Sequence, residues 1–481
     1  MALHSWLATV SLWGALACGC AVEKPVPRQQ IAPPAFEHAA QAPGPSWPAQ
    51  DWYRGFGSAE LDTLVDFAAS NNTDLEGARE RVVQADARAR QAGAAILPSV
   101  SGNANANFLA GRSEQGSGHE LDWLAMLSAS YEVDFWGKNR AIARAARLEA
   151  GASRADRDTV ALTILGGVAD QYFQVLALRE RATIARANRD AAQKILDAVQ
   201  ARFTAGVASP TELASQKAAL DTAQIAITDL EELEMQARAA LAVLLGRIPE
   251  NFTVEGSSLD ALREPVVSAG LPAELLTRRP DVVAAEANLR AGSANVTAAR
   301  AAMFPTLDLT AAVGVQNPAL PATVLTIPGV GPSLQLGANL TQPIFEHGRL
   351  RAQRDEAAAR ERELLAAYRS AIIAALVDVE NALGALQYLN AKREFEQGSV
   401  AESERAFEGA RLRYQSGSGD FLTLLEAQRT LYAARDQFTQ YKLARLQALV
   451  ALCKALGGGW NAPGARTPAV AQGSTEQNAA L

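Results

Sequence analysis

Proline is absent from two very long stretches of this sequence. The chain has no proline between Pro98 and Pro210, and none between Pro343 and Pro463. A proline inside a helix removes a backbone hydrogen bond and clashes with the preceding turn. The two gaps therefore permit helices far longer than the usual length of about 10–14 residues. Alanine, arginine, leucine, glutamate and glutamine dominate these stretches, a composition typical of long helices.

The two stretches also repeat one another at an offset of about 211 residues. The segment Arg413–Gly417 falls on Arg202–Gly206. Two apolar rows with a seven-residue spacing are kept in register across the repeat. In the returning helices, Leu424, Leu431 and Phe438 align with Leu213, Leu220 and Ile227. In the first helices, Ile372, Val379 and Leu386 align with Ala161, Val168 and Val175. Such rows are typical of helices packed as coiled coils. The repeat therefore indicates one supersecondary unit used twice.

Each stretch predicts a long helical hairpin. The first helices are expected over 136–204 and 348–415, each about 100 Å long at 1.5 Å per residue. The chain then turns at 205–209 and 416–419, where glycine favours the end of a helix. Second helices return to about residues 246 and 457. Both tips are therefore expected at one end of the molecule.

A pair of alternating segments precedes each hairpin. Strands are expected over 99–109 and 121–134 in the first half, and over 305–315 and 333–342 in the second. Apolar residues occupy every second position, and the length of about ten residues suits a tilted strand in an outer membrane. No run of 18 or more apolar residues follows the N-terminal region, so strands rather than helices are expected to cross the membrane.

Four strands are too few to close a membrane barrel, and open sheet edges are not tolerated in lipid. Cyclic assembly of three copies would supply twelve strands. The sequence thus predicts a mainly α-helical protein with a membrane β part, built as two tandem repeats of a strand pair and a helical hairpin. A soluble four-stranded sheet is the alternative for these segments.

The N-terminus is typical of an exported protein. An apolar run from Trp6 to Ala17 ends at small residues before Cys20, a pattern similar to a lipoprotein signal in which the cysteine is acylated. Cys18 is the alternative acceptor, and a plain signal peptide the alternative reading. With Cys20 lipidated, Cys453 is expected to be a small buried residue rather than part of a disulfide.

Composition and motifs argue against several other functions. The net charge of −7 and the lack of a basic stripe argue against a nucleic-acid partner. Histidines occur only at positions 4, 38, 119 and 347, so neither a metal cluster nor a cofactor is expected. The Ser416–Gly419 run belongs to the second tip rather than to a phosphate loop or nucleophile elbow, and no enzymatic activity is expected.

Four further motifs carry a family resemblance. They are Leu271–Val282, Ala298–Pro305 before the third strand, and the strand-to-helix junctions Asp134–Lys138 and Pro343–Arg349. Together with the repeat, they resemble the outer-membrane factor, or TolC-like, family, in the lipoprotein subgroup that works with RND-type pumps. The resemblance covers about residues 45–457.

This resemblance implies a homotrimer with a twelve-strand barrel in the outer membrane and an α-helical tunnel through the periplasm. A periplasmic adaptor protein would contact the tunnel's lower end and link it to an inner-membrane RND-type pump. Compounds expelled by the pump would then pass through it passively. A duct for type I protein secretion and a pore-less periplasmic coiled coil are the alternatives.

By the same resemblance, the tips would contact the adaptor. The tip residues are Arg202, Phe203, Gly206, Arg413, Tyr414 and Gly417. Acidic residues beyond the tips would line the closed periplasmic aperture, and the candidates there are Glu212, Asp420, Thr423 and Glu426. Glu212 would be the partner of Tyr414. The alternatives are that the glycines only make the turns, that the arginines complement the helix dipoles, and that the carboxylates are ordinary surface charges.

The expected organisation has six segments. They are a signal peptide at 1–19, an extended N-terminal segment at 20–58, a first repeat at 59–250, a linker at 251–270, a second repeat at 271–457 and a disordered tail at 458–481.

Overall fold

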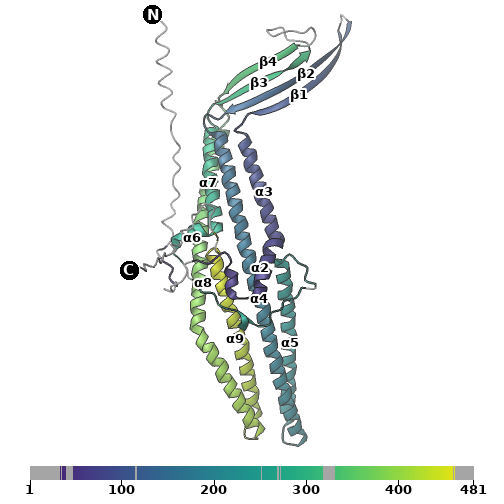
Figure 1. Cartoon of the computed structure of the whole chain (residues 1–481), viewed down its shortest axis with the longest axis vertical. Helices are drawn as coiled ribbons and strands as arrows, with labels where there is room; N and C mark the ends of the chain where they lie inside the picture. Colours follow the sequence, from purple (N-terminus) through teal and green to yellow (C-terminus); the bar gives the residue numbers. More distant parts are fainter. Residues whose placement is uncertain are drawn as a thin grey trace, which may run out of the picture.

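Two helices of 67 residues each set the length of the molecule (Figure 1). They are α4 (Lys138–Thr204) and α8 (Arg349–Gln415), and each spans about 100 Å. Each is followed by a returning helix of 35 residues, α5 (Pro210–Leu244) or α9 (Phe421–Ala455). In this computed structural model both hairpin tips lie at the end of the molecule opposite the β-sheet.

The structure describes most of the chain. The described residues are 33, 35–38, 47–113, 116–250, 252–267, 270, 272–317, 331–458 and 460. The proposed signal peptide, Cys20, Cys18 and the C-terminal tail after residue 460 lie outside them.

A shorter helix leads into each strand pair, and sequence analysis did not identify either one. These helices are α3 (Thr73–Ala94) and α7 (Pro280–Ala301), each of 22 residues. They follow the short helices α2 (Ala59–Asn71) and α6 (Pro272–Arg278). Five of the eleven buried residues of α7 are alanine and one is glycine, so the sequence shows little apolar contrast between the helix faces. Two 3₁₀ helices, η1 (Trp52–Phe56) and η2 (Leu259–Ala261), complete the helical part.

All four strands form one antiparallel sheet. The order is β1 (Ser99–Ser113), β2 (Gly116–Val133), β3 (Thr306–Asn317) and β4 (Gly331–Thr341). The strand pairs of the two repeats are therefore joined side by side, through pairing of β2 with β3. The two outer strands, β1 and β4, leave an open edge on each side of the sheet.

The predicted alternation places large apolar side chains on an exposed face of the sheet. Leu127 lies opposite Val313, and Val313 lies opposite Leu334, so the three form a row across adjacent strands. All three are more than half exposed. Because such a row is unfavourable in water, this face of the sheet is suited to lipid.

The helices form a single layer that continues the order of the strands in the sheet, with four helices side by side at each level. Near the sheet the neighbours in contact run in the order α3, α4, α7, α8. Near the tips the order is α5, α4, α9, α8. Helix α8 therefore lies at one edge of the layer from the sheet to the tips, on the same side as β4. Helices α3 and α5 form the opposite edge, on the same side as β1.

The hydrophobic core lies where the two repeats meet, about halfway along the molecule. Its largest cluster joins α2, α4, α5 and α9 around fully buried side chains such as Phe173, Leu241 and Val450. A second cluster lies between α6, α7, α8 and α9 and includes Tyr368 and Ile372. Burial raises the pKa of the Cys453 thiol in the first cluster to about 12, so it is a poor nucleophile.

Among the described residues, α4 and α8 each contain an 18-residue window that is long and apolar enough to cross a membrane, by length and composition alone. Half of the α4 window and a third of the α8 window are buried inside the protomer. Both helices pack through their apolar middle parts into the core clusters. This packing accounts for part of their hydropathy.

The hairpin tips as the candidate functional site

Both tips turn through a glycine with left-handed backbone. Gly206 has φ of 76° and Gly417 has φ of 77°. The following amides, of Val207 and Ser418, donate to the carbonyl oxygens of Arg202 (2.8 Å) and Arg413 (3.0 Å), closing each helix end. A Cβ built on either glycine would have no atom within 4 Å. Within one protomer, these positions therefore need glycine for backbone conformation and not for packing.

The returning helices begin with a side-chain cap. Ser209 Oγ accepts from the Glu212 amide at 3.1 Å, next to Pro210 in the first turn. In the second tip, Asp420 accepts from the Thr423 amide at 2.9 Å and from the Thr423 hydroxyl at 2.6 Å. These hydrogen bonds, first that of the hydroxyl, lower the pKa of Asp420. Two of the predicted aperture residues, Asp420 and Thr423, are thus engaged with each other as a helix cap.

One arginine connects the two tips. The Arg202 guanidinium lies 4.8 Å from the centroid of the Tyr414 ring, and its Nη1 donates to the Tyr414 carbonyl oxygen at 3.3 Å. The equivalent residue of the second repeat, Arg413, has an exposed side chain. The repeat aligns these two arginines, yet only Arg202 makes a cation–π contact between the repeats.

Tyr414 is the buried centre of the tip region. Its side chain is 3% exposed and packs with Val199, Phe421 and Leu424. Burial raises the pKa of Tyr414; Arg202 opposes this shift and Glu212 adds to it. The hydroxyl has no hydrogen-bond partner among the described residues. Glu212 is therefore near enough to act on Tyr414 electrostatically, but the protomer does not join the two by a hydrogen bond.

The remaining predicted residues are more accessible. Phe203, the equivalent of Tyr414, is 37% exposed. Glu212 is half-buried and Glu426 is exposed. Glu212 and Thr423 occupy equivalent positions in the two returning helices, 211 residues apart. The structure therefore brings Arg202, Tyr414 and Glu212 together, and leaves Phe203 and Glu426 facing outward.

A groove beside the tips was missed by sequence analysis. It has a volume of about 470 Å³ and lies between α4 and α8, with Lys194, Ile195, Arg411 and Tyr414 in its lining. Ala187, Ala191 and Ala198 form the α4 wall. The spacing of these alanines, four and then seven residues, was the available signal, because it places small side chains on one helix face.

The end of the hairpins near the sheet is fixed by a carboxylate and an aromatic pair. Asp134 accepts from the amides of Asn139 (3.0 Å) and Arg140 (2.8 Å). Burial raises the pKa of Asp134, but hydrogen bonds from these amides and the Arg140 guanidinium outweigh it and bring the pKa below its usual value. Trp136 stacks on Phe304 with ring centroids 4.7 Å apart. This pair joins the strand-to-helix junction of the first repeat to the segment between α7 and β3 in the second.

Comparison with known proteins agrees with this geometry. Residues 64–247 and 271–458 match the model of the outer membrane efflux protein family. The pyoverdine export outer membrane protein OpmQ of Pseudomonas aeruginosa is 42% identical over 453 residues, which cover 92% of this chain and 94% of OpmQ.

Two solved structures share the whole architecture. The outer-membrane channel OprN is 26% identical with a TM-score of 0.84, covering 92% of this chain and all of that one. The open state of the Neisseria gonorrhoeae MtrE outer membrane channel is 30% identical with a TM-score of 0.81, covering 91% of this chain and 97% of MtrE.

The fold and the sequence define an outer-membrane channel of the efflux type. The chain belongs to the outer membrane efflux protein family. It is the outer-membrane channel-tunnel of a tripartite efflux system, with its sheet in the membrane and its helical part in the periplasm, and it conducts expelled compounds passively. The predicted fold class and family are thereby confirmed.

Proposed function

We propose that three copies of this chain form a closed duct that receives compounds at the hairpin tips and releases them beyond the outer membrane. The supporting observation is the layer of four elements, which has the same two open sides from the sheet to the tips. Pairing β4 of one copy with β1 of the next would satisfy both sheet edges. Three copies would give twelve strands and a continuous helical wall.

The exposed side chains at the two helical edges support this assembly. Helix α8 exposes Ile373, Val377, Tyr388 and Phe395, between 49% and 78%. On the other edge, α5 exposes Ile225, Leu233, Met235 and Val243, between 45% and 66%. Burial of two such rows against each other is a strong driving force for association.

We further propose that the tips bind a periplasmic adaptor of an RND-type pump. Phe203 and Arg413 are exposed at the tips, and the groove lined by Lys194 and Arg411 lies beside them. An exposed aromatic residue next to arginine is typical of protein interfaces. Asp190 also lines the groove and Arg411 is paired with Glu408, so an adaptor helix with apolar and mixed polar side chains would complement this surface.

The contact between Arg202 and Tyr414 would hold the periplasmic aperture closed. It ties the end of α8 to the end of α4, so breaking it would let the two hairpins separate. Glu212 would become the hydrogen-bond partner of the Tyr414 hydroxyl in the closed trimer, and Glu426, Asp420 and Thr423 would lie nearer the pore axis. Carboxylates from three copies would favour the passage of cations over anions through the aperture.

Acylation at Cys20 would anchor the chain to the membrane. Phe36 lies sixteen positions after Cys20, and an extended chain of that length reaches at most about 55 Å. Glu380, which contacts the residues after Phe36, lies about 46 Å along α8 from Arg349 near the sheet. The segment is therefore long enough to connect a lipid at the membrane with the middle of the helical part.

The exported compound is proposed from the relatives. Because the two OpmQ proteins at 42% identity are pyoverdine exporters by name, pyoverdine is the first compound to test. Expression of this chain in a pyoverdine-producing host that lacks its own export channel should restore secretion. A deletion strain exposed to antibiotics, dyes and metal salts would test the other compounds.

Planar-bilayer recording tests the duct and its closure together. The purified protein should give discrete channels, and native mass spectrometry should give the mass of a trimer. Glu212→Ala or Tyr414→Ala should raise the single-channel conductance because the aperture loosens. Conductance unchanged in both variants would refute the proposed closure, whereas a monomer without channels would refute the trimeric duct.

A further inference from the structure

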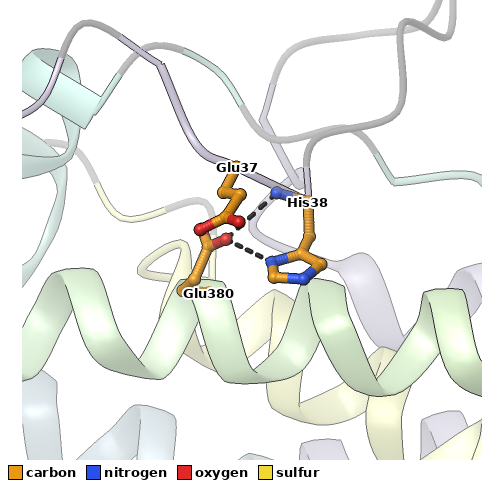
Figure 2. Close-up of side chains that lie close together, drawn as sticks. All are labelled: Glu37, His38 and Glu380. Atoms are coloured by element: carbon orange, nitrogen blue, oxygen red, sulfur yellow. Dashed lines mark hydrogen bonds and ion pairs between the residues drawn. The ribbon is translucent and has the colours of Figure 1, made fainter.

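The N-terminal segment is attached to the second repeat through a buried phenylalanine. Phe36 is 7% exposed and packs in the cluster that contains Leu275, Tyr368 and Ile372. Its burial brings the next two residues, Glu37 and His38, against α8 (Figure 2). They come from a part of the chain that none of the predicted functional sites includes.

These two residues meet a glutamate on α8. The backbone amide of His38 donates to Glu380 Oε1 at 3.0 Å, and the Nδ1 atom of His38 contacts the same oxygen. The imidazole ring lies over Gly384, one turn further along α8, where a Cβ would be 3.9 Å from ring atoms. Glycine at this position thus leaves room for the ring on the same helix face as Glu380.

A second carboxylate completes a group of three possible metal ligands. Among the described residues, one ligand atom each from Glu37, His38 and Glu380 lies within 4.8 Å of the other two. Figure 2 shows the Glu37 carboxylate beside that of Glu380, with the imidazole directed to the same place. Glu37 is exposed and the other two are partly buried, so water can reach the group.

The charges in this group are unbalanced. Two carboxylates that converge repel each other, and a single imidazole offsets at most one of the two negative charges. A divalent cation would balance both. Imidazole nitrogen with two carboxylate oxygens is a ligand set that zinc accepts, with water in the fourth position. Ligand atoms around zinc are separated by about 3.3–3.6 Å. The direct contact between His38 Nδ1 and Glu380 Oε1 would therefore open to admit the ion, and the Glu37 carboxylate would move closer.

We propose that Glu37, His38 and Glu380 bind one divalent transition-metal ion, with Zn²⁺ as the representative, and that the ion fastens the N-terminal segment to α8. All three ligands come from one chain, so the site does not depend on the proposed trimer or on the tips. Residues 38 and 380 are 342 positions apart, which is why the scattered histidines of the sequence predicted no metal cluster.

Zinc binding to the purified full-length protein tests the proposal directly. After dialysis against a chelator, titration with Zn²⁺ in competition with a chromophoric chelator should show one ion per protomer. His38→Ala and Glu380→Gln should each lower the affinity at least 100-fold, and Glu37→Gln about tenfold. His347→Ala, which removes an exposed histidine elsewhere, is the matched control and should leave binding unchanged.

A second measurement separates the metal site from the hydrogen bond alone. Zn²⁺ should slow amide hydrogen exchange in residues 35–38 of the native protein and have no such effect in Glu380→Gln, whose amide oxygen can still accept from the His38 amide. Stoichiometric binding that survives in the His38→Ala, Glu380→Gln double variant would overturn the proposal. So would a native protein that binds no more Zn²⁺ than that variant, with circular dichroism showing both folded.

Discussion

Helices α4 and α8 are equivalent in the repeat and equal in length, yet they are buried to very different extents. Both have 67 residues, and their starts and ends are 211 residues apart. Twenty-two residues of α4 are buried, compared with nine of α8. The difference follows from position in the layer, because α4 has neighbours on both sides and α8 has them on one.

An individual pair of equivalent residues follows the same rule. Ala177 is fully buried, whereas its equivalent, Tyr388, is 67% exposed. The small residue in α4 permits close packing inside the protomer, and the large one in α8 is available to a neighbouring copy. The two repeats therefore share the same long helix. The position of each helix in the layer determines whether a given residue is small and buried or large and exposed.

Polar substitutions on the exposed side of α8 should have the largest effect. Tyr388→Asp combined with Phe395→Asp should abolish the trimer, because six carboxylates would be buried in three interfaces without partners. Native mass spectrometry in detergent should then show monomers. Arg393→Asp, about half a helix turn away on the same helix, is the control and should remain trimeric. A trimer that persists in the double variant would mean that α8 is not the contact.

A substitution in the buried part of α4 tests how much more this helix contributes to stability than α8 does. Phe173→Ala should lower the free energy of unfolding by about 3–5 kcal/mol, because it leaves a cavity where the repeats meet. Gly384→Ala, at the equivalent position, should change it by about 1 kcal/mol or less, since the added methyl group makes an ordinary contact with His38. Chemical denaturation followed by circular dichroism measures both. Equal losses would contradict the assignment of α4 as the central helix.

A buried aspartate in α4 should make stability depend on pH. Burial raises the pKa of Asp170 from 3.8 to about 6, and Lys454 opposes the shift only in part. The folded protein therefore retains a proton that the unfolded chain releases, so the contribution of Asp170 to stability is full below about pH 4 and is lost as the pH rises through 6. The change is at most about 3 kcal/mol.

The second repeat suggests the variant that tests this dependence. Its residue equivalent to Asp170 is Asn381. Asp170→Asn should remove the fall in stability between pH 4 and 7 and stabilise the protein at neutral pH by about 1–3 kcal/mol. Urea unfolding midpoints measured across this range provide the comparison. A native protein whose midpoint rises from pH 4 to 7, with no difference from the variant, would show that Asp170 is ionised throughout.

Local signals in the sequence account for the elements that it predicts well. Proline gaps, a glycine at each tip and alternation in the strands act through the backbone of a few residues, so one sequence is enough to find them. Helix α7 was missed because alanine and glycine make up about half of its buried face, which leaves little apolar periodicity. The different surroundings of Arg202 and Arg413, and the contact between His38 and Glu380, depend on which segments become neighbours. Neither depends on a local pattern.

The smallest expected effect concerns the tips, where the repeats differ again. Phe203 is 37% exposed and Tyr414 is 3% exposed at equivalent positions. Phe203→Ala should therefore change the free energy of unfolding by no more than about 0.5 kcal/mol. Tyr414→Ala, in contrast, should lower it by about 3 kcal/mol. If Phe203 contacts an adaptor, its substitution should weaken crosslinking between the channel and the adaptor while conductance stays the same. Loss of stability in Phe203→Ala would instead assign this side chain to the interior of the trimer.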